Sequence, residues 1–243
     1  MIIVNADDWG RSRVETDAAL TCYRAARITS VSAMVFMADS TRASELAREA
    51  GIDVGLHINL TQRFSGEARF APLADRLDRI ARFLGAHRYA SLIYNPALRE
   101  QFRYVYQAQF DEFVRLYGKA PSHLNGHHHQ HLCANMLFDR VIPAGAKVRR
   151  SFHFWPGEKG LMNRSYRRLV NSWLARRYSL TDFFFALAHC LAGDRMARVA
   201  ELARTTRVEV MTHPIDPLER DYLMSDRYVS AIDGLERGTY SSL

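Results

Sequence analysis

Short apolar segments that alternate with helical patterns constrain the fold of this 243-residue chain more than any other feature. Segments rich in β-branched residues are predicted to be strands at 1–4, 30–37, 54–60 and 207–212, with a further strand near 147–150. Helical patterns fall between them at 12–26, 41–50, 73–88, 96–117, 134–143 and 194–205. This alternation predicts an α/β fold with a parallel sheet or barrel and right-handed crossovers. No repeat or linker divides the chain, so residues 1–243 are expected to form a single domain.

Local signals predict several helix ends. Ser12 and Glu15 have the spacing of a capping box at the start of the first helix. Gly51 is expected to end the second helix, and Gly118 is expected to end the fourth. The aromatic, arginine-rich segment 151–190 carries no pattern that assigns an element.

The composition argues against several classes of protein. The net charge is +7, from 33 basic and 26 acidic residues, but no basic run with interleaved aromatics is present, so no nucleic-acid partner is predicted. The three cysteines are far apart and odd in number, which predicts reduced thiols and a cytoplasmic location. The N-terminus turns acidic early and is not expected to act as a signal peptide. The apolar segment 183–192 is about half the length that spans a bilayer, but it could contact the inner face of a membrane.

Five of the ten histidines lie within nine residues, at 123, 127, 128, 129 and 131. Neutral imidazoles need hydrogen-bond partners when buried, so a purely structural cluster would be costly. Metal binding or proton transfer explains the density better. If the segment is extended, the histidines at 123, 127, 129 and 131 share one side with Asn125, and His128 lies on the other. Gly126 can break that alternation, so only a subset would be ligands.

Residues suited to chemistry follow four of the predicted strands. They are Asp7 and Asp8, His57, the histidine cluster and His213. Taken singly, each has an ordinary structural explanation, such as a helix cap or a strand end. In a βα barrel the carboxyl ends of the strands meet, so these groups are expected to converge. One Asp and two His would leave about three open positions on a divalent ion, as in a catalytic site, and the second carboxylate could act as base.

The segments Asn5–Gly10, Gly55–Leu60, His123–His131 and Met211–Pro214 resemble the four motifs of the YdjC-like carbohydrate deacetylases, which include chitooligosaccharide deacetylase. The resemblance runs from residue 1 to about 228. It implies a distorted (β/α) TIM-like barrel and one divalent metal ion. Matching the motifs residue by residue implies a site of three metal ligands, one base and one acid. The ligands would be Asp8, His57 and His127, the general base Asp7, and the acid for the leaving amine His213.

The chain departs from the family pattern at two positions. It has Asn125 where the family commonly has Asp, and Trp9 where it has Phe. Neither change removes an implied ligand, but Asn125 removes a charge beside the metal and could alter metal preference or histidine orientation. The segments 222–226 and 238–241 resemble the branch associated with hopanoid biosynthesis, which implies an N-acetylglucosaminyl lipid as substrate. That reading would give Phe183–Phe185 and the basic surface a role in peripheral membrane contact, whereas the alternative is that these three residues are core.

The predicted activity is therefore removal of the N-acetyl group from an amino sugar, free or lipid-linked. The ligand types suit zinc, manganese, iron or, less well, magnesium. Two other functions use similar residues: metal-dependent phosphoester hydrolysis, and non-catalytic binding of a sugar or glycolipid. Retention of both Asp7 and Asp8 argues against mere binding, because binding does not require the spare carboxylate. The determinants of substrate choice are expected in the loop 62–72 and in segment 151–190.

Overall fold

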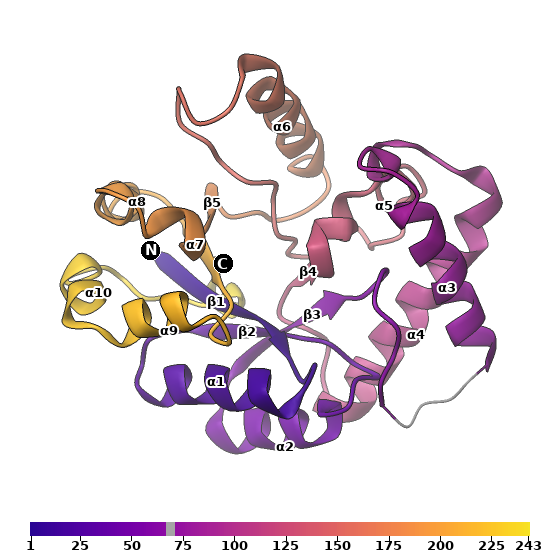
Figure 1. Cartoon of the computed structure of the whole chain (residues 1–243), viewed down its shortest axis with the longest axis horizontal. Coiled ribbons are helices and arrows are strands. Elements are labelled where there is room, and N and C mark those ends of the chain that lie inside the picture. The colour runs from indigo at the N-terminus through magenta and orange to yellow at the C-terminus, as the bar shows by residue number, and fades with distance from the viewer. Residues whose placement is uncertain (67–70) are drawn as a thin grey trace.

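A computed structural model describes residues 1–66 and 71–243, and in these residues six strands form one sheet in the order β4-β3-β2-β1-β6-β5. Every neighbouring pair is parallel. The strands are β1 (Ile2–Trp9), β2 (Ser30–Ala33), β3 (Asp53–Ile58), β4 (Leu124–Gly126), β5 (Phe183–Ala186) and β6 (Val208–Thr212). The sheet curls into a half-barrel surrounded by helices (Figure 1), which confirms the predicted α/β, TIM-like fold.

Helices follow the strands and cover the sheet (Figure 1). They are α1 (Arg13–Arg24), α2 (Ser40–Ala50), α3 (Ala71–Gly85), α4 (Arg99–Tyr117), α5 (Ala134–Phe138), α6 (Leu161–Leu174), α7 (Leu187–Cys190), α8 (Arg195–Ala203), α9 (Pro217–Met224) and α10 (Asp226–Ala231). The α3 helix shows why such segments form, because Leu73, Leu77, Ile80 and Leu84 make one buried face. Gly51 and Gly118 end α2 and α4 in the left-handed conformation, as predicted.

Some predicted elements differ in the structure. The prediction of a capping box at Ser12 is wrong. The Ser12 hydroxyl donates to the Glu15 carboxylate, and the Ser12 side chain accepts no hydrogen bond from a backbone N–H of α1. The predicted strand near 147–150 is also wrong, since this segment makes only two isolated bridges, from Val148 to Leu124 and from Lys147 to Ser179. The β2 strand stops at Ala33, before a turn in which Phe36 has a φ of 61°. The α5 helix is shorter than the predicted 134–143.

The segment 151–190 contains α6, β5 and α7. Phe184 and Phe185 are buried in β5 and belong to the core, so the idea that Phe183–Phe185 form a membrane-contacting patch is wrong for these side chains. No helix among the described residues is long and apolar enough to cross a membrane. Residues 67–70 of the predicted loop 62–72 lie outside the described residues.

The C-terminal segment returns to the start of the sheet. The Ile2 N–H donates to the Glu236 carbonyl at 2.8 Å, and the Gly238 N–H donates to the Ile2 carbonyl at 3.0 Å. Tyr240 is fully buried and its ring stacks on His123, with 3.9 Å between the ring centroids. The last residues of the chain therefore pack beneath the histidine strand.

Candidate metal centre

A bulge at the end of β1 aims two neighbouring carboxylates at one site. The register between β1 and β2 shifts between Ala6 and Trp9, and Asp8 has a φ of 64°. A regular strand would send Asp7 and Asp8 to opposite faces. The left-handed conformation, costly for a residue other than glycine, instead brings both carboxylates close to His57.

Asp8 lies between two imidazoles that come from β3 and from the end of β4. Its Oδ1 atom is 3.1 Å from His127 Nδ1 and 3.4 Å from His57 Nε2. The candidate ligand atoms of Asp8, His57 and His127 all lie within 4.8 Å of one another, and all three residues are buried. The sequence thus correctly predicted that these three residues converge.

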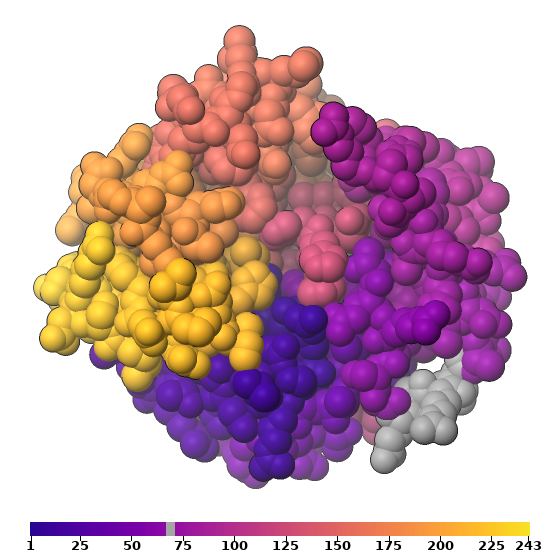
Figure 2. Space-filling view, in the orientation of Figure 1, coloured from indigo at the N-terminus to yellow at the C-terminus, as the bar shows by residue number. Residues whose placement is uncertain are grey.

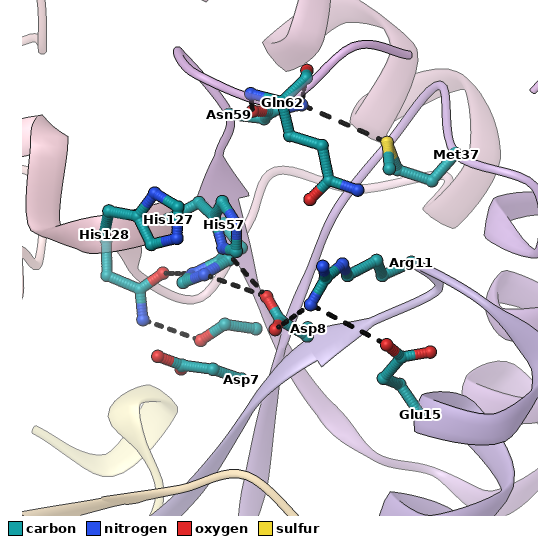
Figure 3. A network of polar contacts seen from close by, with 12 residues as sticks. Asp7, Asp8, Arg11, Glu15, Met37, His57, Asn59, Gln62, His127 and His128 are labelled. Atoms are coloured by element: carbon teal, nitrogen blue, oxygen red, sulfur yellow. Dashed lines mark hydrogen bonds and ion pairs between the residues drawn. The ribbon is translucent and has the colours of Figure 1, made fainter. Parts of the chain in front are cut away.

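The two oxygens of the Asp8 carboxylate have different surroundings. Oδ2 accepts a hydrogen bond from Arg11 Nη1 at 3.0 Å, whereas Oδ1 is buried and accepts none from any described residue. Figure 3 shows Asp8 between the His57 ring and the Arg11 guanidinium. A buried carboxylate oxygen with no donor is costly unless something else pairs with it. One such oxygen beside two imidazole nitrogens fits a divalent cation.

The charges around Asp8 favour its ionised form. Burial by itself would raise the pKa of Asp8, but contacts with His127 and His57 hold that pKa well below its ordinary value. Burial by itself would lower the pKa of His57, but the charges of Asp7 and Asp8 raise it. Asp8 is therefore ionised throughout the neutral range.

Asp7 belongs to a buried ion cluster that the sequence did not predict. Arg149 Nη1 and Nη2 donate to its two oxygens at 2.6 and 2.8 Å, and Arg149 Nε donates to Glu209 Oε1 at 2.8 Å. The Tyr240 hydroxyl donates to the other oxygen of Glu209. Burial by itself would raise the pKa of Asp7, but the Arg149 charge outweighs it and lowers that pKa below its ordinary range. Arg149 thus holds the Asp7 carboxylate in one orientation and keeps it ionised.

The Asn125 side chain contacts His57 on the side away from Asp8. Its amide lies 2.7 Å from His57 Nδ1 and 2.7 Å from Ser32 Oγ. With the amide oxygen toward Ser32, that oxygen also accepts from Arg149 Nη1 at 3.1 Å and Nη2 at 3.0 Å, and the amide nitrogen donates to His57 Nδ1. With the oxygen toward His57, the amide nitrogen faces the guanidinium. The orientation of Asn125 therefore determines which His57 nitrogen carries the proton.

The remaining histidines of the cluster do not alternate as an extended strand would. The strand ends at Gly126, and His128 and His129 have positive φ values of 52° and 57°. His128 is exposed and contacts the Thr61 hydroxyl at 3.2 Å, while His129 packs edge-on against Phe152. His128 therefore lies on the surface beside the site, whereas His129 is half-buried among aromatic side chains.

His123 and His131 are buried and hydrogen-bond to groups next to the site. His123 Nε2 lies 3.0 Å from the Ser32 hydroxyl, and His131 Nε2 lies 3.0 Å from the Arg149 carbonyl. Burial lowers the pKa of both residues, that of His131 to about 3. Both rings are consequently neutral and take part in packing and hydrogen bonding.

β6 pairs with β1, and Thr212, the last residue of β6, lies opposite Ala6. His213 is the next residue after Thr212, just as Asp7 is the next after Ala6. The Glu219 carboxylate accepts from the His213 N–H at 3.0 Å and from the Thr212 hydroxyl at 2.7 Å. Glu219 is buried, so these two bonds fix the backbone at His213.

Three residues at the site, Arg11, Arg149 and Glu209, escaped prediction from the sequence. Glu209 offered a signal, since an acidic residue in the middle of a buried strand requires a cationic partner. The partner could not be identified, because Arg149 lies 60 residues away in a segment without regular structure.

Comparisons with known proteins agree with this geometry. The family described as YdjC-like protein matches residues 1–232. A human protein named carbohydrate deacetylase is 29% identical over 248 residues, covering 88% of this chain and 74% of its own length. Chitooligosaccharide deacetylase of Proteus mirabilis is 31% identical over 148 residues, covering 60% of this chain and 54% of its own length.

One solved structure has the same fold along nearly the whole chain. It is a protein of Enterococcus faecalis V583, provisionally named for cellobiose-phosphate cleavage, with a TM-score of 0.65 and 17% identity. The match covers 99% of this chain and 97% of that protein. At this identity the likeness establishes the fold.

Proposed function

The chain belongs to the YdjC-like protein family, and we propose that it is a metal-dependent hydrolase that removes the N-acetyl group from an N-acetylated amino sugar. The observation that carries this proposal is the buried Asp8 Oδ1 atom, which accepts no hydrogen bond from a described residue and lies 3.4 Å from His57 Nε2 and 3.1 Å from His127 Nδ1. The relatives named carbohydrate deacetylase and chitooligosaccharide deacetylase support an acetylated sugar as substrate.

One divalent ion would be held by Asp8, His57 and His127. Zinc, manganese, iron and, less well, magnesium suit a set of one carboxylate and two imidazoles. When bound, such an ion polarises the acetyl carbonyl and acidifies a water molecule. Arg11 neutralises the second oxygen of Asp8 and leaves Oδ1 for the ion.

Asp7 would accept the proton of the attacking water. Because Arg149 keeps Asp7 ionised, its carboxylate is ready to act as a base at neutral pH. The bidentate ion pair also prevents the carboxylate from turning away from the substrate. The same ion pair makes Asp7 a weak base, which is consistent with its taking a proton only from an acidified water.

His213 would donate a proton to the departing amine. It follows the strand next to β1, and Glu219 holds its backbone. Amide hydrolysis requires a base for the attacking water and a proton donor for the departing amine, and Asp7 and His213 would supply them.

The substrate would be either a free chitooligosaccharide or an N-acetylglucosaminyl group on a hopanoid lipid. The second alternative places the enzyme in the cytoplasm at the inner face of the membrane. Its membrane contact would have to use residues other than Phe184 and Phe185, which are buried.

The test is acetate release from N-acetylglucosamine, short chitooligosaccharides and an N-acetylglucosaminyl lipid, with and without a chelator. We expect release from at least one substrate, loss of that release on chelation, and restoration by added metal. His57→Ala should lose both activity and bound metal, while Leu218→Gln on the exposed face of α9 should retain both. Metal-loaded protein that releases acetate from none of these substrates would contradict the proposal.

A further inference from the structure

A chain of buried polar contacts connects the C-terminal segment with Asp7. The Tyr240 hydroxyl donates to one oxygen of Glu209, and Arg149 Nε donates to the other at 2.8 Å. The opposite edge of the same guanidinium donates to both oxygens of Asp7, from Nη1 at 2.6 Å and from Nη2 at 2.8 Å. Tyr240, Glu209 and Arg149 are fully buried, and Asp7 is 4% exposed. These four side chains therefore form one continuous path from residue 240 to the proposed base.

Glu209 lies too deep in the half-barrel to reach a substrate beside Asp7. In the register of β6 and β1 it is opposite Ile3, and Asp7 lies roughly 13 Å further along that strand. Among the described residues, the Glu209 side chain bonds only to Arg149 and Tyr240. Any influence of Glu209 on Asp7 must therefore pass through the Arg149 guanidinium.

Two carboxylates fix the orientation of the Arg149 guanidinium. Asp7 binds one edge, and one oxygen of Glu209 binds the other, at 2.8 Å from Nε and 2.7 Å from Nη2. The ring of Phe184 packs against the guanidinium, 4.9 Å from Arg149 Cζ. Because a guanidinium is planar and its N–H groups have a fixed geometry, a rotation at the Glu209 edge changes the direction of the donors at the Asp7 edge.

Tyr240 completes the hydrogen bonding of Glu209 and is itself held in place. Its carbonyl accepts from Lys147 Nζ at 2.6 Å, and the nearby Gly238 N–H donates to the Ile2 carbonyl at 3.0 Å. Without the hydroxyl, one buried Glu209 oxygen would have no donor among the described residues, so the carboxylate would gain by turning toward another partner. The family match ends at residue 232, so Tyr240 lies outside the part of the chain that it covers.

We propose that Glu209 and Tyr240 are positioning residues of the candidate site. Through Arg149 they hold the Asp7 carboxylate in the orientation in which it accepts a proton from the attacking water. The inference rests on the proposed deacetylase function, because it requires Asp7 to act as the base. The alternative is that the cluster contributes to stability alone, in which case the effect of Tyr240 on the reaction would not depend on Arg149.

The kinetic test removes the Tyr240 hydroxyl alone. Tyr240→Phe keeps the ring that stacks on His123, and in metal-loaded protein it should lower kcat for acetate release about tenfold, with KM and metal affinity changed by less than about twofold. Tyr228→Phe is the matched control, because this buried hydroxyl donates to the Arg27 carbonyl at 2.7 Å, away from the site. Figure 2 shows the C-terminal part of the chain, in yellow, packed against the indigo N-terminal part. The control should keep kcat within about twofold.

A double-mutant cycle with Arg149→Lys separates positioning from stability. Lysine keeps the buried charge but lacks the planar guanidinium with its two edges. If Tyr240 acts through Arg149, adding Tyr240→Phe to Arg149→Lys should lower kcat by less than a further twofold, roughly. Equal losses in the two backgrounds would overturn the proposal. Lys147→Met, which removes the donor to the Tyr240 carbonyl, is a second variant should Tyr240→Phe not fold, and an unchanged kcat in whichever variant folds would also overturn it.

A nuclear magnetic resonance measurement tests the positioning without any reaction. The Nε–H signal of Arg149 is the one that Arg149→Lys removes from the proton–nitrogen correlation spectrum. Tyr240→Phe should shift this signal, because the Glu209 oxygen that accepts from Nε turns, and Tyr228→Phe should leave it in place. A shifted signal in protein that releases no acetate would retain the link between Tyr240 and Arg149 and contradict the proposed function instead. Acetate release with an unshifted signal would overturn the positioning proposal alone.

Discussion

Replacing Asn125 with aspartate is expected to tighten divalent-metal binding about 10- to 100-fold. His57 can offer Nε2 to an ion only when the proton is on Nδ1, and that Nδ1–H group then needs an acceptor. The Asn125 oxygen can accept it at 2.7 Å. In that orientation the amide nitrogen is about 3 Å from the Arg149 guanidinium. Two donors then face each other in a buried site.

The size of the effect follows from these contacts. The opposite amide orientation satisfies Arg149 Nη1 and Nη2, at 3.1 and 3.0 Å, but donates to His57 Nδ1. This leaves the proton on Nε2, so the amide must turn and lose those contacts before metal binds. Losing hydrogen bonds to a buried group costs about 1–3 kcal/mol, or roughly 5- to 150-fold in affinity. A carboxylate at 125 accepts from His57, Ser32 and Arg149 in a single orientation, which removes this cost.

The assay is a competition titration of zinc or manganese against a chelator, with Asn125→Asp compared with the unchanged protein. Gln62→Glu is the control for charge alone, because it adds the same charge in the loop after β3, where the hydrogen bonds of Gln62 within the described part of the chain go to Asn59 and none to His57. We expect the control to change the affinity less than threefold. Equal or weaker binding by Asn125→Asp, or equal tightening by Gln62→Glu, would refute the reasoning about proton position.

Three further predictions concern stability. Arg149→Met leaves Asp7 and Glu209 buried without their cation and should lower the free energy of unfolding by about 3–5 kcal/mol in urea titrations, whereas a change below 1 kcal/mol would contradict the ion cluster. Gly55→Ala places a Cβ atom 2.3 Å from the His123 ring and should cost about 1–3 kcal/mol by the same method; Gly85→Ala, which meets nothing within 4 Å, is the control. Since burial lowers the pKa of His131 to about 3, the unfolded chain binds the extra proton first, so stability should fall as the pH drops from about 6.5 toward 3. His131→Gln should reduce that pH slope, and an unchanged slope would show that His131 does not contribute to it.

The parts of the fold that were predicted correctly depend on local signals. β1, β3 and β6 each contain short stretches rich in apolar and β-branched residues. Gly51 ends its helix because the left-handed φ of 67° favours glycine there. The histidine segment was harder, because the chain folds back at Gly126, where a Cβ atom would be 2.8 Å from the His131 nitrogen. The α6 helix was not predicted, although Val170, Trp173 and Leu174 have helical spacing and pack against or within the core. Leu161 and Leu169 of the same helix are exposed, which obscures that pattern in the sequence.

The two adjacent carboxylates show why a motif alone could not give the whole site. Their position at the end of one strand does not distinguish Asp7 from Asp8, and only the resemblance to the family assigned Asp8 as ligand and Asp7 as base. The structure distinguishes them by their partners: Asp7 is held by Arg149, 142 residues away, whereas Asp8 faces His57 and His127. The Arg149 guanidinium already neutralises the Asp7 carboxylate and donates to both of its oxygens, so Asp7 is a poor ligand for a further cation. Asp8, in contrast, has one oxygen that accepts no hydrogen bond from a described residue and lies beside two imidazoles. The resemblance implied the division of roles, with Asp8 as ligand and Asp7 as base. Its physical reason lies in a distant arginine in a loop, which no local pattern could identify.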